Sequence, residues 1–162
     1  MITNSNDFLT RLQEIEGGTT SNKMINPTTE PMVFIDSNAR IIDTNKILDN
    51  FVIVSEDTNA ETIYFVIDRY YDDVDLSTKN ILIKYKNPIG EIYSDKPTII
   101  YEELIDNSEK LVFGWQINSN ATKYSGALTV QIMIYSYKEN SSVFDYILNT
   151  TLCNIKIHKG LN

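Results

Sequence analysis

The feature that most constrains the fold is a succession of short apolar segments, separated by polar turns, that begins at Met32 and runs almost to the C-terminus. Residues 80–86 alternate, with Ile81, Ile83 and Tyr85 on one phase and Lys84 and Lys86 on the other. This period of two is typical of a strand with one buried face. Because no long helical period interrupts the segments, the sequence predicts an all-β fold, an antiparallel β-sandwich.

Strands are expected wherever such a segment is bounded by Gly, Pro, Asn, Asp or Ser. The expected strands are residues 32–36, 39–44, 51–55, 62–69, 80–86, 97–104, 110–117, 127–138, 143–150 and 151–159. Residues 118–126 are expected to contain one helical turn. The inward-facing positions form the expected core: Ile63, Phe65, Ile81, Ile83, Phe113, Trp115, Val130, Ile132 and Ile155.

The first 31 residues follow a different pattern. A short amphipathic helix is expected there because four apolar residues share one helical face: Phe8, Leu9, Leu12 and Ile15. Residues 19–31 are polar, include two prolines and have no period, which predicts an extended linker. The expected domains are therefore a helix and linker arm at 1–31 and a β-sandwich domain at 32–162. Since so short a helix is unstable alone in water, its apolar stripe is expected to bind a partner.

Composition and charge limit the function classes. The formal net charge of −8 argues against nucleic-acid binding, which needs clustered Lys and Arg, and against an anionic membrane surface. No apolar run approaches the roughly 20 residues that a membrane-spanning helix requires. The opening residues MITNSNDF lack the basic end and apolar core of a secretory signal. We therefore expect synthesis in a cytoplasm, with neither a nucleic-acid nor a membrane partner.

Candidate catalytic residues are few, and no enzyme is expected. His158 is the single histidine and lies on the outward phase of the last strand, so the sequence offers no histidine pair for a metal. Glu102 and Glu103 are adjacent on a strand and should point to opposite faces, unlike the carboxylates of a glycosidase. Cys153 alternates with buried positions and is expected to be a small apolar residue. The sequence thus predicts no catalytic residues and no cofactor.

The stretch RYYDDVDLST, residues 69–78, is the main candidate for a ligand or interface rim. The candidate rim residues are Tyr70, Tyr71, Asp72, Asp73 and Asp75. Clustered carboxylates suit Ca²⁺, but the glycine and the closing glutamate of an EF-hand loop are missing, so no metal is assigned. An acidic turn anchored by Val74 and Leu76 accounts for the same residues without a ligand. Sugar stacking on the tyrosines is a further alternative, whereas Trp115 lies on the inward phase and is expected in the core.

Four motifs follow one another between about residues 50 and 160. They are the acidic turn Asp75-Leu76-Ser77, the turn Pro88-x-Gly90, a strand that carries Trp115, and the step Thr122-x-Tyr124-x-Gly126. Their order resembles the N-terminal domain family of bacteriophage baseplate upper proteins and related minor tail structural proteins of Gram-positive hosts. The resemblance rests on the order of the motifs and not on any one signature.

The resemblance implies a β-sandwich that serves as a virion building block. Family members often continue into further C-terminal modules, and this chain stops at Asn162, which favours an adaptor or decoration subunit over a receptor-binding protein. The expected function is a non-enzymatic structural subunit of a phage or phage-tail-like particle, in the tail or baseplate rather than the head. It would be made in the host bacterial cytoplasm.

The expected partners are other virion structural proteins, with the chain itself present as a homo-oligomer or in many copies of a symmetric assembly. The alternative, from a different class, is a carbohydrate-binding module for host-surface attachment. That module would use the tyrosines and the acidic turn, with or without Ca²⁺.

Overall fold

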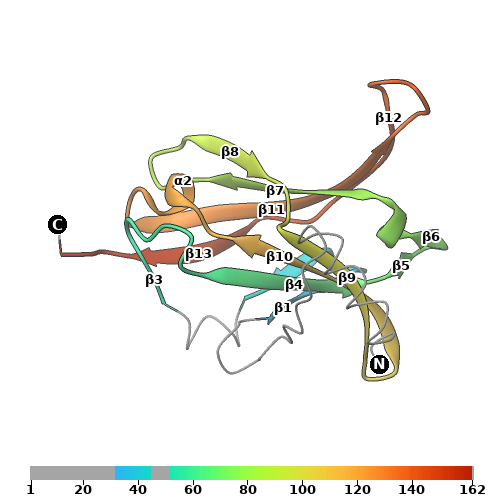
Figure 1. The fold of residues 1–162 in the computed structure, drawn as a ribbon, viewed down its shortest axis with the longest axis horizontal. Helices are drawn as coiled ribbons and strands as arrows, with labels where there is room; N and C mark the ends of the chain where they lie inside the picture. The colour runs from blue at the N-terminus through green and yellow to red at the C-terminus, as the bar shows by residue number, and fades with distance from the viewer. Residues whose placement is uncertain (1–31, 45–51, 162) are drawn as a thin grey trace, which may run out of the picture.

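The computed structural model describes residues 32–44 and 52–161, which form an all-β fold (Figure 1). Sheet A has five strands in the order β2-β1-β4-β10-β9, and sheet B has the order β3-β13-β11-β7-β8, with β12 paired to β11. The predicted helix and linker, with the stripe Phe8, Leu9, Leu12 and Ile15, lie outside the described residues. Among the described residues, no helix is long and apolar enough to span a membrane.

Sheet A consists of β1 (Met32–Asp36), β2 (Ile41–Asp43), β4 (Thr62–Asp68), β9 (Ile99–Ile105) and β10 (Ser108–Gln116). Sheet B consists of β3 (Ile53–Val54), β7 (Asn80–Lys86), β8 (Ile92–Asp95), β11 (Gly126–Tyr137), β12 (Phe144–Asn149) and β13 (Cys153–His158). A small ribbon of β5 (Tyr70–Tyr71) and β6 (Val74–Asp75) precedes the 3₁₀ helix η1 (Leu76–Thr78), and the one-turn helix α2 (Ser119–Thr122) precedes β11. The all-β prediction is confirmed, and each expected strand segment contains a strand.

The sheets are mixed, so the expectation of antiparallel pairing throughout is wrong. Strand β1 pairs in parallel with β4, with Val33 opposite Phe65, and β3 pairs in parallel with β13, with Ile53 opposite Ile157. The partners in each pair are far apart in sequence. The intervening chain is therefore long enough for the crossover that parallel pairing needs.

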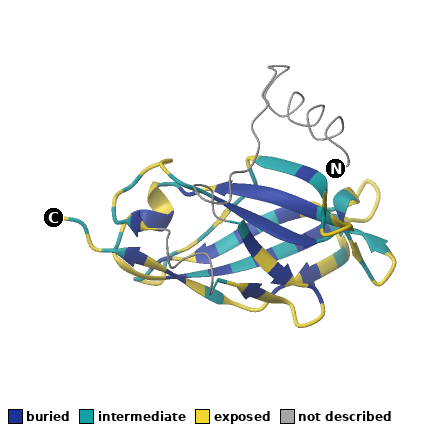
Figure 2. Ribbon diagram, turned by 90° about the horizontal axis from the view of Figure 1, so that it is seen from below, coloured by how far each residue is buried: buried dark blue, intermediate teal, exposed yellow. Residues whose placement is uncertain are grey.

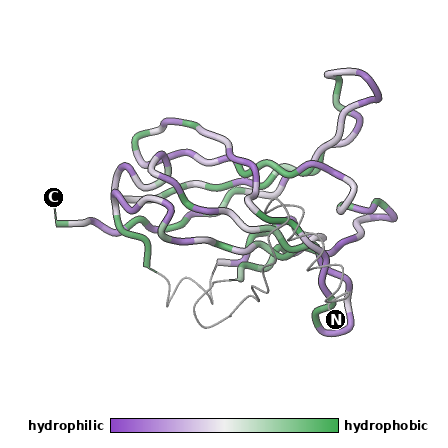
Figure 3. Tube along the Cα trace, in the orientation of Figure 1, coloured by the Kyte–Doolittle hydropathy of each residue, from purple (hydrophilic) through white to green (hydrophobic). Residues whose placement is uncertain are grey.

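One apolar core is shared by the two sheets. All the predicted core residues are buried in it: Ile63, Phe65, Ile81, Ile83, Phe113, Trp115, Val130, Ile132 and Ile155. The rings of Phe65 and Phe113 stack across β4 and β10 with their centroids 5.4 Å apart. Figure 2 shows the buried residues concentrated on the strands and the exposed residues in the loops. Figure 3 shows polar and apolar residues interspersed along these strands, which is the pattern that predicted the core.

Trp115 links sheet A to sheet B by packing and by a hydrogen bond. Its ring lies 5.1 Å from that of Tyr85 on β7, and its Nε1 donates to Oδ2 of Asp95 on β8 at 2.9 Å. Asn118 donates to the same carboxylate oxygen at 2.7 Å and accepts a hydrogen bond from the Tyr85 hydroxyl at 3.2 Å. Burial raises the pKa of Tyr85 well above its ordinary value, so the hydroxyl remains a donor. The network supplies hydrogen-bond partners to polar groups that would otherwise be buried without them.

We predict that Trp115→Ala destabilises the fold by about 3 to 5 kcal/mol, because it removes a buried ring and leaves a cavity. The matched variant Trp115→Phe keeps an aromatic ring but removes the donor to Asp95, and is expected to cost about 1 to 3 kcal/mol. Urea denaturation of both variants measures the difference. An unchanged midpoint for Trp115→Ala would contradict the role of this residue as the link between the sheets.

Candidate protein-interaction surface

The predicted rim forms the tip of the small β5–β6 hairpin. Tyr71 pairs with Val74, and the two turn residues between them, Asp72 and Asp73, have φ values of 46° and 67°. Positive φ at both central residues is typical of tight hairpin turns, and Asp adopts it more readily than most residues. Leu76 is buried in the core and Val74 packs against it, so the predicted anchoring is confirmed.

Arg69 ties this hairpin to sheet A. Its Nε and Nη2 donate to the two carboxylate oxygens of Asp75 at 3.1 and 3.0 Å, while its Nη1 lies 3.2 Å from Glu109 and 3.7 Å from Glu102. Asp75 also accepts hydrogen bonds from the backbone N–H and the hydroxyl of Ser77. The hydrogen bonds from Arg69 lower the pKa of Asp75 to about 2. The Asp75 carboxylate is therefore occupied by structural contacts.

The geometry of the rim favours neither of the ligand chemistries considered for it. The guanidinium of Arg69 lies 5.2 Å from the ring centroid of Tyr70, and that of Arg40 lies 5.6 Å from the ring centroid of Tyr71. Each arginine covers a ring face on which a sugar would stack. Within residues 32–44 and 52–161, no group of three or more His, Cys, Asp or Glu side chains is placed to hold a metal ion. The rim is best described as a braced turn.

The other candidate reactive residues are Cys153, Glu102, Glu103 and His158. Cys153 is half-buried, and burial raises the pKa of its thiol to about 12, so it is a poor nucleophile. Glu102 and Glu103 lie opposite Leu111 and Lys110, at successive positions of β9 that face opposite sides of the sheet, as predicted. His158 is partly exposed at the end of β13.

A larger aromatic surface lies on the β11–β12 hairpin of sheet B, whose loop end extends away from the rest of the two sheets (Figure 1). The rings of Tyr137 and Phe144 stack with centroids 5.0 Å apart, and Tyr135 meets them edge-on at 5.6 and 5.8 Å. Tyr137 is 46% exposed and Phe144 is 42% exposed. Aromatic groups of this size are unfavourable to leave in water, so they mark a candidate interaction surface.

A β-bulge explains why the alternation of the sequence did not reveal this surface. Ile147 pairs with Tyr135 and Phe144 pairs with Tyr137, and the register shifts between Ser136 and Tyr137. The extra residue on β12 places Phe144 and Ile147 on the same side although they are three positions apart. We call the four residues on that side, Tyr135, Tyr137, Phe144 and Ile147, the aromatic face.

The opposite side of the hairpin is held against the body of the protein. Lys79, which follows η1, places its Nζ 5.1 Å from the ring centroid of Tyr146 and 3.4 Å from the hydroxyl of Ser136. Burial raises the pKa of Tyr146, and the nearby Tyr71 raises it further by a smaller amount. The hairpin therefore has a defined orientation relative to the β5–β6 ribbon.

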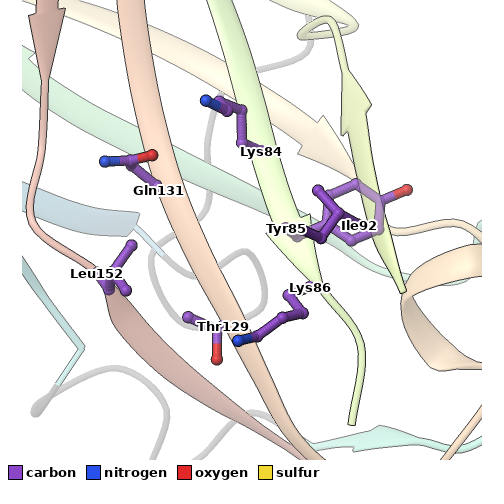
Figure 4. A pocket seen from close by; sticks show the side chains of 7 residues that line it. All are labelled: Lys84, Tyr85, Lys86, Ile92, Thr129, Gln131 and Leu152. Carbon is purple, nitrogen blue, oxygen red and sulfur yellow. The ribbon is translucent and has the colours of Figure 1, made fainter. Parts of the chain in front are cut away.

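A shallow groove of about 280 Å³ lies on the outer face of sheet B (Figure 4). It is lined by Lys84, Tyr85, Lys86, Ile92, Thr129, Gln131 and Leu152. The single aromatic residue in this set, Tyr85, is only 2% exposed because its ring belongs to the core. The groove thus presents the exposed aliphatic side chains of Ile92 and Leu152 beside amino, amide and hydroxyl groups, but no ring face for stacking on a sugar.

Comparison of the chain with protein-family models gave no match, and comparison with curated proteins gave none either. The similarity to baseplate and tail proteins therefore remains an expectation drawn from the order of motifs.

We predict that Asp75→Asn destabilises the protein by about 1 kcal/mol at neutral pH, after allowance for solvent screening of the ion pair. Because the folded-state pKa of Asp75 is about 2, below its ordinary value, the stabilisation is complete above pH ~4 and is lost as the pH falls through the folded pKa. Urea denaturation from pH 7 down to about pH 2 should therefore show that the difference in the free energy of unfolding between the wild type and Asp75→Asn becomes smaller.

The exposed turn residue Asp73 provides the control, since Asp73→Asn should leave stability nearly unchanged at every pH. A gap between the wild type and Asp75→Asn that stays constant down to pH ~2 would show that the ion pair is not its source.

Proposed function

We propose that the protein is a non-enzymatic structural subunit of a phage or phage-tail-like particle that acts through protein–protein assembly. The observation that carries the proposal is the aromatic face, with Tyr137, Phe144 and Ile147 each more than 40% exposed on a projecting hairpin. Aromatic residues are enriched in the buried centres of protein interfaces, where they supply most of the binding energy. The adjacent Val143, 56% exposed, extends the apolar surface toward the hairpin loop.

We further infer that sheets A and B are the two layers of a β-sandwich, in which the projecting hairpin is built on the longest strand. The shared core and the Trp115–Tyr85 contact between strands of different sheets support this inference. Strand β11 pairs with β7, β12 and β13. A hairpin anchored in this way can be presented to a partner at low entropic cost.

The phage assignment draws on the motif order, and two of those motifs meet in space. Gly126 has a φ of 127°, and a Cβ at this position would lie 3.1 Å from Cβ of Pro88. Gly90, in the same turn as Pro88, has a φ of 93°. Both glycines therefore occupy backbone conformations that other residues rarely adopt. The Pro-x-Gly turn and the Gly126 step belong to one packed corner, which is a physical reason for the two motifs to occur together.

The assembly proposal predicts that the full-length protein self-associates and that the double variant Tyr137→Ser/Phe144→Ser weakens association at least about tenfold, or ~1.4 kcal/mol. Stability should change little because both side chains are exposed. Ile92→Ser, which removes a 72% exposed residue elsewhere on sheet B, is the matched control and should associate like the wild type. Sedimentation velocity over a concentration series measures the difference. Equal association of the double variant and the wild type would contradict the proposal.

The particle assignment needs a separate measurement. Phage or tail-like particles released by the source bacterium should contain this chain when they are purified by density and analysed by mass spectrometry. Recovery of the chain only in the particle-free fraction would contradict a virion role while leaving the self-association result intact.

A further inference from the structure

A second apolar cluster lies on sheet A, on the side away from the shared core. It comprises Tyr64 and Val66 of β4, Tyr101 of β9 and Val112 of β10, and none of the four is more than 2% exposed. These positions alternate along the strands with residues of the shared core such as Phe65. They therefore project from the opposite face of the sheet. We call this surface the outer face of sheet A.

The described part of the chain supplies no layer that would cover this face. Every described member of the cluster belongs to sheet A itself, including Met32, Ile99 and Ile105, which are partly buried at its margin. Sheet B packs on the other side through the shared core. A tyrosine on an uncovered sheet surface would keep much of its ring in water, so exposures of 2% and below require a covering layer.

A charged residue on the same face indicates how far the cover extends. Glu103 lies two positions after Tyr101 on β9 and therefore faces the same side. Burial raises the pKa of its carboxyl group. Tyr101 on the same strand is 2% exposed, so the cover reaches β9, at the far edge of the sheet from β1.

The segment at residues 1–31 has the position, length and chemistry to provide the cover. The segment is joined directly to Met32, which packs against the cluster. Strand β9 lies three strand spacings from β1, or about 14 Å. The residues at 19–31 can span on the order of 40 Å, so the preceding stretch can lie anywhere on the face. That stretch carries the apolar stripe of Phe8, Leu9, Leu12 and Ile15.

We propose that the apolar stripe of residues 1–31 packs on the outer face of sheet A of the same chain. The packing is favourable because it removes four apolar side chains of the stripe and four of the outer face from water. The stripe, expected from sequence to bind a neighbouring subunit, is part of the protein's own fold in this account. The proposal is independent of the phage assignment, and it leaves the aromatic face as the surface for assembly.

Hydroxyl-radical footprinting of the full-length protein tests the proposal, with the labelling of individual tyrosines read by mass spectrometry. Leu12→Asp places a charge in the stripe and should raise the labelling of Tyr64 and Tyr101 several-fold. Tyr85 in the shared core should stay protected. In the control variant Gln13→Asp, which changes the next residue outside the stripe, the labelling of Tyr64 and Tyr101 should match that of the wild type. Continued protection of Tyr64 and Tyr101 in the Leu12→Asp variant would overturn the proposal.

A photo-crosslinker tests the same contact without disturbing the charge. Benzoylphenylalanine in place of Phe8 should cross-link within one chain to peptides of β4, β9 or β10, at every protein concentration. Increased labelling of Tyr85 would show that Leu12→Asp unfolds the whole domain. The cross-link within one chain would support the proposal in that case too. Cross-links to sheet B, or cross-links formed only between two chains, would overturn it, the latter by identifying a second copy as the cover.

Discussion

Trp115 reaches from sheet A to sheet B, where its ring packs on Tyr85 and its Nε1 donates to Asp95. A buried indole N–H without an acceptor is costly, so the position of Asp95 on β8 restricts how the two sheets can be placed relative to each other. Asn118 closes the network by bonding both Asp95 and Tyr85. With the sheets held in this way, the long strand β11 has a fixed direction, and so does the hairpin that it forms with β12.

The two apolar surfaces outside the shared core differ in how far their side chains are exposed. The four residues of the outer face of sheet A are at most 2% exposed, whereas Tyr137 and Phe144 of the aromatic face are 46% and 42% exposed. A face that is already covered contributes to folding, and a face left in water is available to a partner. The Arg69 cluster belongs with the first class, because its contacts to Asp75, Glu109 and Glu102 bind the hairpin of the predicted rim to sheet A.

Much of the fold could be predicted from alternation, because alternation reports which side of a strand is buried; Ile81, Ile83 and Trp115 are examples. Alternation does not report which strand lies alongside, so the parallel partners of β1 and β3 were missed. The aromatic face was missed because the bulge at Ser136 and Tyr137 changes the phase of β12. The interpretation of the rim depended on Arg69 and Glu109, which are distant in sequence and become neighbours only in the fold. The short strand β8 has too few residues to show a period.

Hydrogen–deuterium exchange of the full-length protein, measured over a range of concentrations, tests the central claim that assembly uses the aromatic face of an otherwise closed domain. Strand β12 pairs only with β11 among the described strands, so its remaining amides depend on a partner for protection. The account predicts that exchange in β12 and the end of β11 slows as the protein associates, while β4 and β10 exchange slowly at every concentration. Association that slows exchange in sheet A and leaves β12 unchanged would contradict it.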